Sequence, residues 1–283
     1  METTLIPTGT VVVGLDGSPS SDRALTWAVE HAVRERRQLT LAHGLDPAGS
    51  VWLDREGADH RAVEDALRAD ALALLDRGRD HVLQVAPELA VHVALWMSDA
   101  RVTLLDLAER AALVVVGSRG RGPVGSLLLG SVSVGVSRHA PCPVVVVRAG
   151  HPGVVRNGVL VGTDASERSR PVVEFAYRQA ALRELPLTIV HSASDADAEL
   201  GLAEALAGLA EKFPEVRTTT RIVSEHPAAG IVRESARMDL VVLGAHHRGT
   251  AGTLLHGSVT DSVVEHAGCP VAVVPLGVAG SAA

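Results

Sequence analysis

The stretch that decides the fold runs from Val114 to Ser133 and reads VVVGSRGRGPVGSLLLGSVS. Its β-branched, apolar start is typical of a buried strand, and its end predicts the first turn of a helix. Between them stand four glycines in nine positions, Gly117 to Gly125. Glycine permits positive φ and close backbone approach, and a helix N-terminus offers unpaired N–H groups to an anion. The stretch is a candidate phosphate-binding loop, although glycine-rich loops also occur as plain turns.

A second copy of this pattern makes the chain a tandem repeat. The aspartate turn near the start of the first copy recurs 148 residues later, whereas the glycine motif recurs only 127 residues later. The second copy is therefore 21 residues shorter between these two features, and we place the loss between Ser192 and Val223. We predict two domains, residues 1–150 and 151–283, with a linker at 149–157. The pairs at 127 are Gly117 and Gly244, Gly130 and Gly257, Ser131 and Ser258, and Cys142 and Cys269; the pair at 148 is Asp16 and Asp164.

Strands and helices alternate along both copies, which predicts α/β domains with doubly wound parallel sheets. The expected strands of the first copy are 10–15, 39–43, 90–95, 114–117 and 143–148, and its expected helices are 22–37, 61–84, 102–112 and one that begins near 130. In the second copy the pattern restarts at Gly158, with strands at 187–191, 217–223, 240–244 and 271–274 and a shortened helix at 198–211.

The composition and charge limit the classes of protein to which this chain can belong. The 283 residues carry a formal net charge of −7, which argues against a nucleic-acid binder, and are 47% hydrophobic but only 2% aromatic, so Val, Leu and Ala must form the cores. The two cysteines belong to separate copies and predict packed core thiols without a disulfide, as in a reducing compartment. No 18-residue apolar run and no signal peptide are recognisable, so we expect a cytoplasmic protein with no membrane contact.

The chain resembles a tandem universal stress protein of the adenine-nucleotide-binding kind. The family motif Gly-x2-Gly-x9-Gly-(Ser/Thr) is matched by Gly117, Gly120, Gly130 and Ser131. A Gly-x-Asp-x-Ser turn, a second strand that ends in His and a closing Cys-Pro-Val strand also match, and the resemblance covers nearly the whole chain twice. The second copy departs from the motif because His247 replaces the second glycine.

The resemblance implies two parallel five-stranded sheets with strand order 3-2-1-4-5, the adenine nucleotide alpha hydrolase-like fold. Ligands of such sheets bind at the carboxyl ends of the strands where the order reverses. Asp16 and Gly117 are then expected at one crevice, and Asp164 and Gly244 at another. The expected nucleotide contacts are Gly14, Asp16, Gly44, Gly117, Arg119, Gly120, Arg121, Gly130, Ser131, Val132 and Ser133 in the first copy, and Asp164, Ser192, Gly244, His247, Gly257, Ser258 and Val259 in the second.

Each class of contact has a simpler alternative. The aspartates contact the nucleoside by resemblance, or only cap a turn. By the same resemblance, Gly44 and Ser192 are expected to offer backbone groups to adenine, although their residue types say little because only the backbone is used. Ser131 and Ser258 meet a terminal phosphate, or act as N-cap residues worth about 1 kcal/mol. Arg119 and Arg121 complement phosphate charge, or are merely solvated.

The histidines leave similar alternatives open. His247 either crowds a backbone that requires positive φ or contacts phosphate through its imidazole. With His246 it forms only a weak metal-ligand pattern. His43 and His191, at strand ends, are expected to be core or rim residues rather than catalysts.

The predicted function is that of an ATP-binding regulator of stress response or growth, with Mg²⁺ accompanying ATP. An enzyme is not expected: no Gly-x4-Gly-Lys-(Ser/Thr) loop occurs, and Lys212, the only lysine, is far from both loops. A nucleotide-free interaction or chaperone-like module and a slow ATPase are the alternatives. The closing strands, 143–148 and 271–274, are the family's usual pairing edge, which implies an intrachain pseudo-dimer, a homodimer and an unidentified protein partner.

Overall fold

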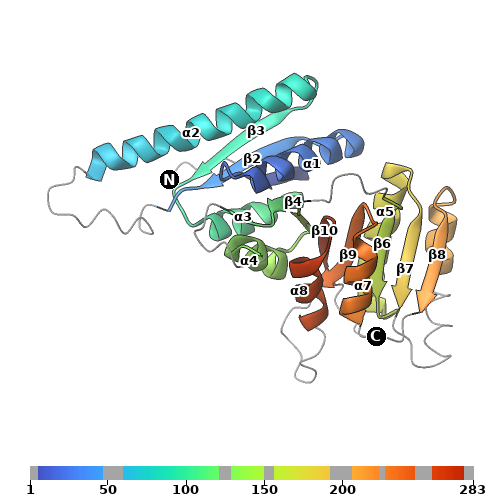
Figure 1. Ribbon diagram of the computed structural model, residues 1–283. Helices are drawn as coiled ribbons and strands as arrows, with labels where there is room; N and C mark the ends of the chain where they lie inside the picture. Colours follow the sequence, from blue (N-terminus) through green and yellow to red (C-terminus); the bar gives the residue numbers. More distant parts are fainter. Residues whose placement is uncertain are drawn as a thin grey trace, which may run out of the picture. The chain divides into compact units, whose positions relative to one another are not determined.

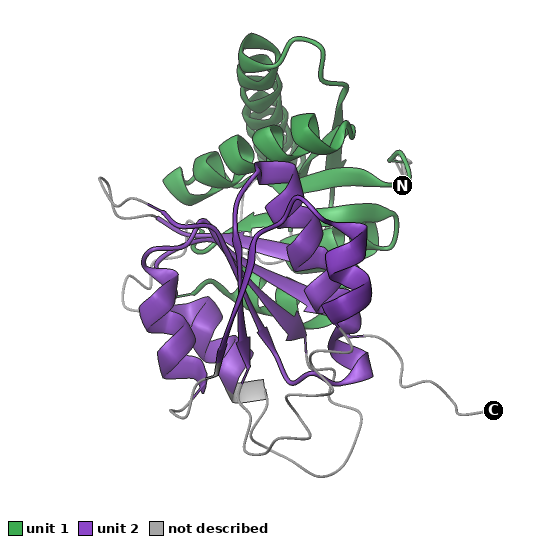
Figure 2. Ribbon diagram, turned by 90° about the vertical axis from the view of Figure 1, so that its right-hand side faces the viewer, with its two compact units in different colours: residues 1–142 green, residues 143–283 purple. Residues whose placement is uncertain are grey.

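The computed structural model describes residues 6–46, 60–120, 129–149, 156–191, 206–222, 227–245 and 257–276. The chain divides into two compact units, Met1–Cys142 and Pro143–Ala283 (Figure 2). Each unit contains parallel strands flanked by helices, so the predicted doubly wound α/β fold is confirmed. Within the described residues, no helix is both long and apolar enough to cross a membrane.

The first unit has four parallel strands in the order β3-β2-β1-β4 (Figure 1). The order in which strands are added to the sheet reverses between β1 and β4. These two strands are direct parallel neighbours, with Val12 paired to Val114 and Val13 to Val115. Helices α3 and α4 pack side by side. The elements are β1 (Thr10–Gly14), α1 (Pro19–Glu35), β2 (Leu39–Gly44), α2 (His60–Val85), β3 (Val91–Trp96), α3 (Ala100–Ala108), β4 (Ala111–Gly117) and α4 (Ser131–His139).

The second unit repeats the order with its own strands, β8-β7-β6-β9-β10, which corresponds to 3-2-1-4-5. The strand β5 (Val144–Val147) also belongs to this unit and pairs with β10 in the antiparallel direction, with Val146 opposite Val271. The other elements are β6 (Val159–Thr163), a 3₁₀ turn (Glu167–Ser169), α5 (Arg170–Arg183), β7 (Leu187–His191), β8 (Thr218–Ile222), α7 (Pro227–Ser235), β9 (Leu240–Ala245), α8 (Gly257–His266) and β10 (Val271–Pro275).

The structural division falls at Cys142, eight residues before the predicted boundary at 150. The difference follows from β5, which pairs with β10 of the second unit. Both cores are built from strand residues such as Val11–Val13 and Leu240–Val242, each of them at most 1% exposed. Apolar runs of this kind are expected where helices cover both faces of a parallel sheet.

Two helices begin earlier than predicted because of their N-caps. Ser18 accepts the N–H of Ser21, and Pro19 occupies the first turn, so α1 starts at Pro19 rather than at residue 22. The Asp99 carboxylate accepts the N–H groups of Arg101 and Val102, so α3 starts at Ala100. The prediction of helix over 102–112 is wrong at its end, because Ala111 already pairs with Thr10 in the sheet. Of the predicted helix at 198–211, only 206 onward lies within the described residues, and it is helical.

Candidate functional site

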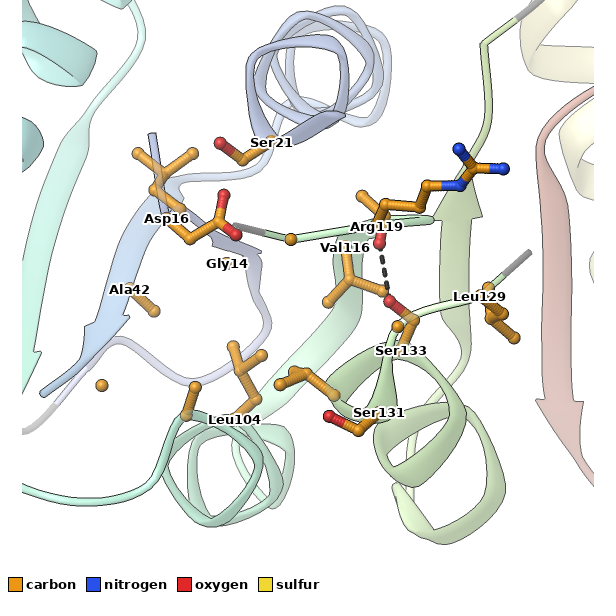
Figure 3. A pocket seen from close by; sticks show the side chains of 17 residues that line it. Gly14, Asp16, Ser21, Ala42, Leu104, Val116, Arg119, Leu129, Ser131 and Ser133 are labelled. Atoms are coloured by element: carbon orange, nitrogen blue, oxygen red, sulfur yellow. Dashed lines mark hydrogen bonds between the residues drawn. The ribbon is translucent and has the colours of Figure 1, made fainter. Parts of the chain in front are cut away.

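A cavity of about 560 Å³ opens at the carboxyl ends of β1, β2 and β4 of the first unit (Figure 3). It lies where the strand order reverses, the usual position of a ligand in an open α/β sheet. Ten predicted contact residues line it: Gly14, Asp16, Gly44, Gly117, Arg119, Gly120, Gly130, Ser131, Val132 and Ser133. Asp16 and Ser21 stand on one side of the cavity, and Ser131 and Ser133 stand on the other.

The turn after β1 holds Asp16 at the cavity wall. Its Oδ1 accepts the N–H of Ser18 at 3.0 Å, and Gly17 between them has a φ of +73°. Only glycine adopts that conformation without steric cost. Ser18 is also the N-cap of α1, so one short segment both starts the helix and positions the carboxylate.

The loop after β4 is pressed against this turn. A Cβ on Gly117 would lie 2.7 Å from the backbone carbonyl of Ser20, and a Cβ on Gly120 would lie 2.6 Å from Oδ2 of Asp16. The N–H of Arg119 donates to the Ser20 hydroxyl at 3.3 Å. The close approach of this loop to the turn after β1 therefore explains why positions 117 and 120 are occupied by glycine. The same packing places Arg119, whose side chain is exposed, at the rim of the cavity.

The start of α4 forms the opposite wall. Gly130 is the N-cap, and its N–H donates to the carbonyl of Ser118 at 2.8 Å. The suggested N-cap role of Ser131 is therefore wrong: it is the first helical residue, and its side chain is exposed. The N–H groups of residues 131–133 have no acceptor inside the helix. A Cβ on Gly130 would lie 3.7 Å from Arg119 Cα, so it would fill space between loop and helix without a clash.

Ser133 has a structural contact that its sequence position did not reveal. It is 3% exposed, and its hydroxyl donates to the Gly117 carbonyl at 2.6 Å. In the second unit Thr260, at the same repeat position, donates to the Gly244 carbonyl at 2.9 Å. We name this bond the helix–strand clamp. Sequence reasoning overlooked Thr260, although its offset of 127 from Ser133 could have identified it.

An apolar half of the cavity was also missed by sequence reasoning. It is formed by side chains from β2, β4, α3 and the residue after β1: Ala42, Val116, Ala100, Leu104 and Leu15. Gly44 approaches α3 so closely that a Cβ there would lie 2.6 Å from the Ala100 Cα. The α3 residues carry no motif, so only the fold reveals that they line the site.

The corresponding turn of the second unit differs in its bonding. Oδ1 of Asp164 accepts both the N–H of Ser166 at 3.0 Å and its hydroxyl at 2.8 Å. Burial raises the pKa of Asp164, but hydrogen bonds from Ser166 and Ser169 outweigh it, and the net pKa is lowered. Ala165, which replaces Gly17, has a φ of +59°. This unit therefore holds an alanine in a left-handed conformation that costs about 1–2 kcal/mol.

The two strand-end histidines have equivalent partners. Nδ1 of His43 donates to the Leu15 carbonyl at 2.6 Å, and Nδ1 of His191 donates to the Thr163 carbonyl at 3.0 Å. His191 is 2% exposed, as expected of a core residue. In the part of the chain that the structure describes, no group of three or more His, Cys, Asp or Glu side chains is arranged to hold a metal ion.

The remaining predicted contacts either lie outside the described residues or belong to β9 and α8 of the second unit. Arg121, Ser192 and His247 lie outside the described residues. Gly257 and Ser258 begin α8, followed by Val259, and Gly244 stands near the end of β9, where a Cβ would lie 2.7 Å from Leu276 Cδ2.

Comparisons with known proteins agree with this architecture. A family model described as "Universal stress protein family" matches residues 7–148 and 156–275. A universal stress protein of Mycobacterium tuberculosis strain H37Rv is 34% identical over 291 residues, which is 93% of this chain and 95% of the relative. A relative in Mycolicibacterium smegmatis is 34% identical over 294 residues, 93% and 96% of the two chains. A crystal structure of a universal stress protein from Archaeoglobus fulgidus, 22% identical, has the same fold, with a TM-score of 0.73 over 96% of this chain and 98% of that one.

Proposed function

Because this chain belongs to the universal stress protein family, we propose that its first unit binds ATP, with Mg²⁺, in the cavity between β1 and β4. Binding makes the protein a nucleotide-dependent regulator of stress response or growth. The observation that carries the proposal is the convergence of the intact glycine motif, Asp16 and the N-terminus of α4 on a single cavity.

The cavity has the size and polarity that this ligand requires. Its volume of about 560 Å³ falls within the roughly 300–1,000 Å³ of small-molecule sites. The apolar half, with Leu104 and Val116, suits a purine ring. The rim with Arg119, the Ser131 hydroxyl and the first N–H groups of α4 suits the phosphates.

The unobstructed space at Gly130 supports the same assignment. Neither a positive φ nor a steric clash requires glycine there. A methyl group at this position would instead enter the space that faces residues 118–120, where we place the phosphates. Asp16 is the single carboxylate among the residues that line the described cavity, so Mg²⁺ would be held chiefly by ATP phosphates and water.

We assign the second unit a weaker site. Its turn is closed by the Ser166–Asp164 bonds, and His247 replaces a motif glycine. We place the protein in the cytoplasm, because both cysteines are free and buried. We also propose a homodimer and an intrachain pseudo-dimer of the two units, as the closing strands of such domains commonly pair, and a protein partner that reads the bound state.

Counting nucleotide released from heat-denatured protein tests the proposal. About one ATP per chain is expected, with loss in Gly130→Ala. Gly208→Ala is the matched control, because a Cβ there meets nothing within 4 Å. Two ATP per chain would assign full binding to the second unit. No nucleotide, together with no binding of added Mg-ATP, would instead favour the nucleotide-free interaction module, and steady phosphate release that Gly130→Ala abolishes would favour the slow ATPase.

A further inference from the structure

A second cavity, of about 550 Å³, lies between α1 and α2 of the first unit. Its floor is apolar, with Leu25 and Leu74, and its rim carries Arg23 from α1 and Arg77 and His81 from α2. Nothing in the nucleotide motif predicts this cavity.

The sequence of α2 explains why this groove stays open. Leu74, Arg77, Gly78 and His81 have the spacing of one helix face, and all four line the cavity. A face that packs on a neighbouring helix is ordinarily apolar throughout. A Cβ on Gly78 would lie 3.0 Å from Leu15 Cδ1 and 3.3 Å from Leu41 Cδ1 of β2, so glycine lets α2 approach the sheet closely. Arg77 and His81 stand at the rim.

Within the described part of the chain, the basic side chains at this rim have no carboxylate partner. Among the described residues, no ion pair or hydrogen bond joins the side chain of Arg23, Arg77 or His81 to an acid, although the chain as a whole carries a net charge of −7. Asp22 is the one acidic residue that lines the cavity. Two arginines and a histidine beside one carboxylate, above an apolar floor, are complementary to a small anion with an apolar or hydroxylated body.

We propose that the α1–α2 cavity is a second ligand site, which binds a small phosphate-bearing anion. The guanidinium groups of Arg23 and Arg77 contact the phosphate, assisted by His81, while Asp22 accepts hydroxyl groups of the ligand. The site is distinct from the proposed nucleotide site but adjoins it, because Leu15 and Ser21 line both cavities.

Calorimetric titration with inorganic pyrophosphate, at low salt and without Mg²⁺, tests the site. The titration uses the full chain, in the wild type and in an Arg119→Gln background that weakens phosphate binding at the first cavity. We expect saturable binding that Arg23→Gln and Arg77→Gln each weaken about tenfold. Arg79→Gln is the matched control, because it removes the same charge from α2 at a residue that does not line the cavity, and its effect should stay within about twofold.

Three results would overturn the proposal: no saturable heat up to about 10 mM pyrophosphate, an equal loss in Arg79→Gln, or a loss only in Arg119→Gln. Thermal denaturation of each variant checks that it is folded. Competition by ATP and by glycerol phosphate in the Arg119→Gln background then distinguishes a second nucleotide from a phosphorylated metabolite, and competition by either supports the site. Failure of both to displace bound pyrophosphate would contradict it.

Discussion

The Asp16 carboxylate lies against the backbone of Gly120, so that a methyl group built on Gly120 would come within 2.6 Å of Asp16 Oδ2. The two residues are 104 positions apart in the chain. Their contact joins the turn after β1 to the loop after β4 at the edge of the cavity.

Substitution of Gly120 should therefore act through Asp16. We expect Gly120→Ala to displace the carboxylate and to lower ATP affinity at least tenfold, while the free energy of unfolding changes by less than about 1 kcal/mol, because a side-chain tip can rotate away. A double-mutant cycle with Asp16→Ala, read by calorimetry, should be clearly non-additive. Additive losses would mean that the contact does not matter for binding.

Substitutions of the other two motif glycines should differ in how much they lower the free energy of unfolding. A Cβ on Gly117 meets backbone atoms of Ser20 at 2.7 Å, whereas one on Gly130 meets nothing closer than 3.7 Å. Gly117→Ala should lower the free energy of unfolding by about 1–3 kcal/mol, and Gly130→Ala by about 1 kcal/mol at most. Urea unfolding followed by circular dichroism measures both, and the reverse order would contradict the geometry.

The left-handed residue of the second unit offers a stabilising substitution. Ala165 has a φ of +59°, where Gly17 of the first unit has +73°. Ala165→Gly should raise the free energy of unfolding by about 0.5–1 kcal/mol, because relief of strain exceeds the added entropy of the unfolded chain. Gly17→Ala should lower it by a similar amount. Urea midpoints of both variants provide the comparison, and a destabilised Ala165→Gly would show that the strain is absent.

The helix–strand clamp should depend on a hydroxyl group rather than on serine itself. Ser133→Ala leaves the Gly117 carbonyl without its 2.6 Å partner and should cost about 1–3 kcal/mol. Ser133→Thr should recover most of that loss, since Thr260 makes the same bond in the second unit. Thermal unfolding of the three proteins gives the answer, and equal losses in Ala and Thr variants would refute the clamp.

The two buried cysteines predict a loss of stability at alkaline pH. Burial raises the pKa of both Cys142 and Cys269 from 9.0 to about 12. Between these values the unfolded chain releases protons that the folded chain retains, so the stabilising contribution is complete below pH 9 and is lost as the pH rises toward 12. Urea unfolding from pH 8 to 10.5 should show a shallower decline in the Cys142→Ala, Cys269→Ala double variant than in the wild type.

The repeat and the strand pattern were sufficient to predict the fold. Runs such as Val114–Val116 are buried on both faces, and glycine spacing fixed the correspondence between the copies. Helix ends were harder to predict. The start of α1 depends on the Ser18 cap, and the end of α3 on pairing between Ala111 and Thr10, residues far apart in sequence.

The candidate site was predictable only where a motif marked it. The backbone-mediated positions, including Gly117 and Gly120, could be read from spacing. Ala100 and Leu104 could not, because they reach the cavity through the packing of α3 against the sheet. Ser133 was predicted as a ligand contact, and the structure adds that its hydroxyl donates to the Gly117 carbonyl.

The antiparallel pairing of β5 with β10 has a consequence for how the protein is made. During synthesis β5 emerges before every other strand of its unit, yet Val146 must wait for Val271, 125 residues later, before this pairing can form. Contacts so distant in sequence form slowly, and an unpaired strand edge can template aggregation in the meantime. A nascent chain halted before Val271 would therefore lack β10, and β5 would have no strand to pair with on that side.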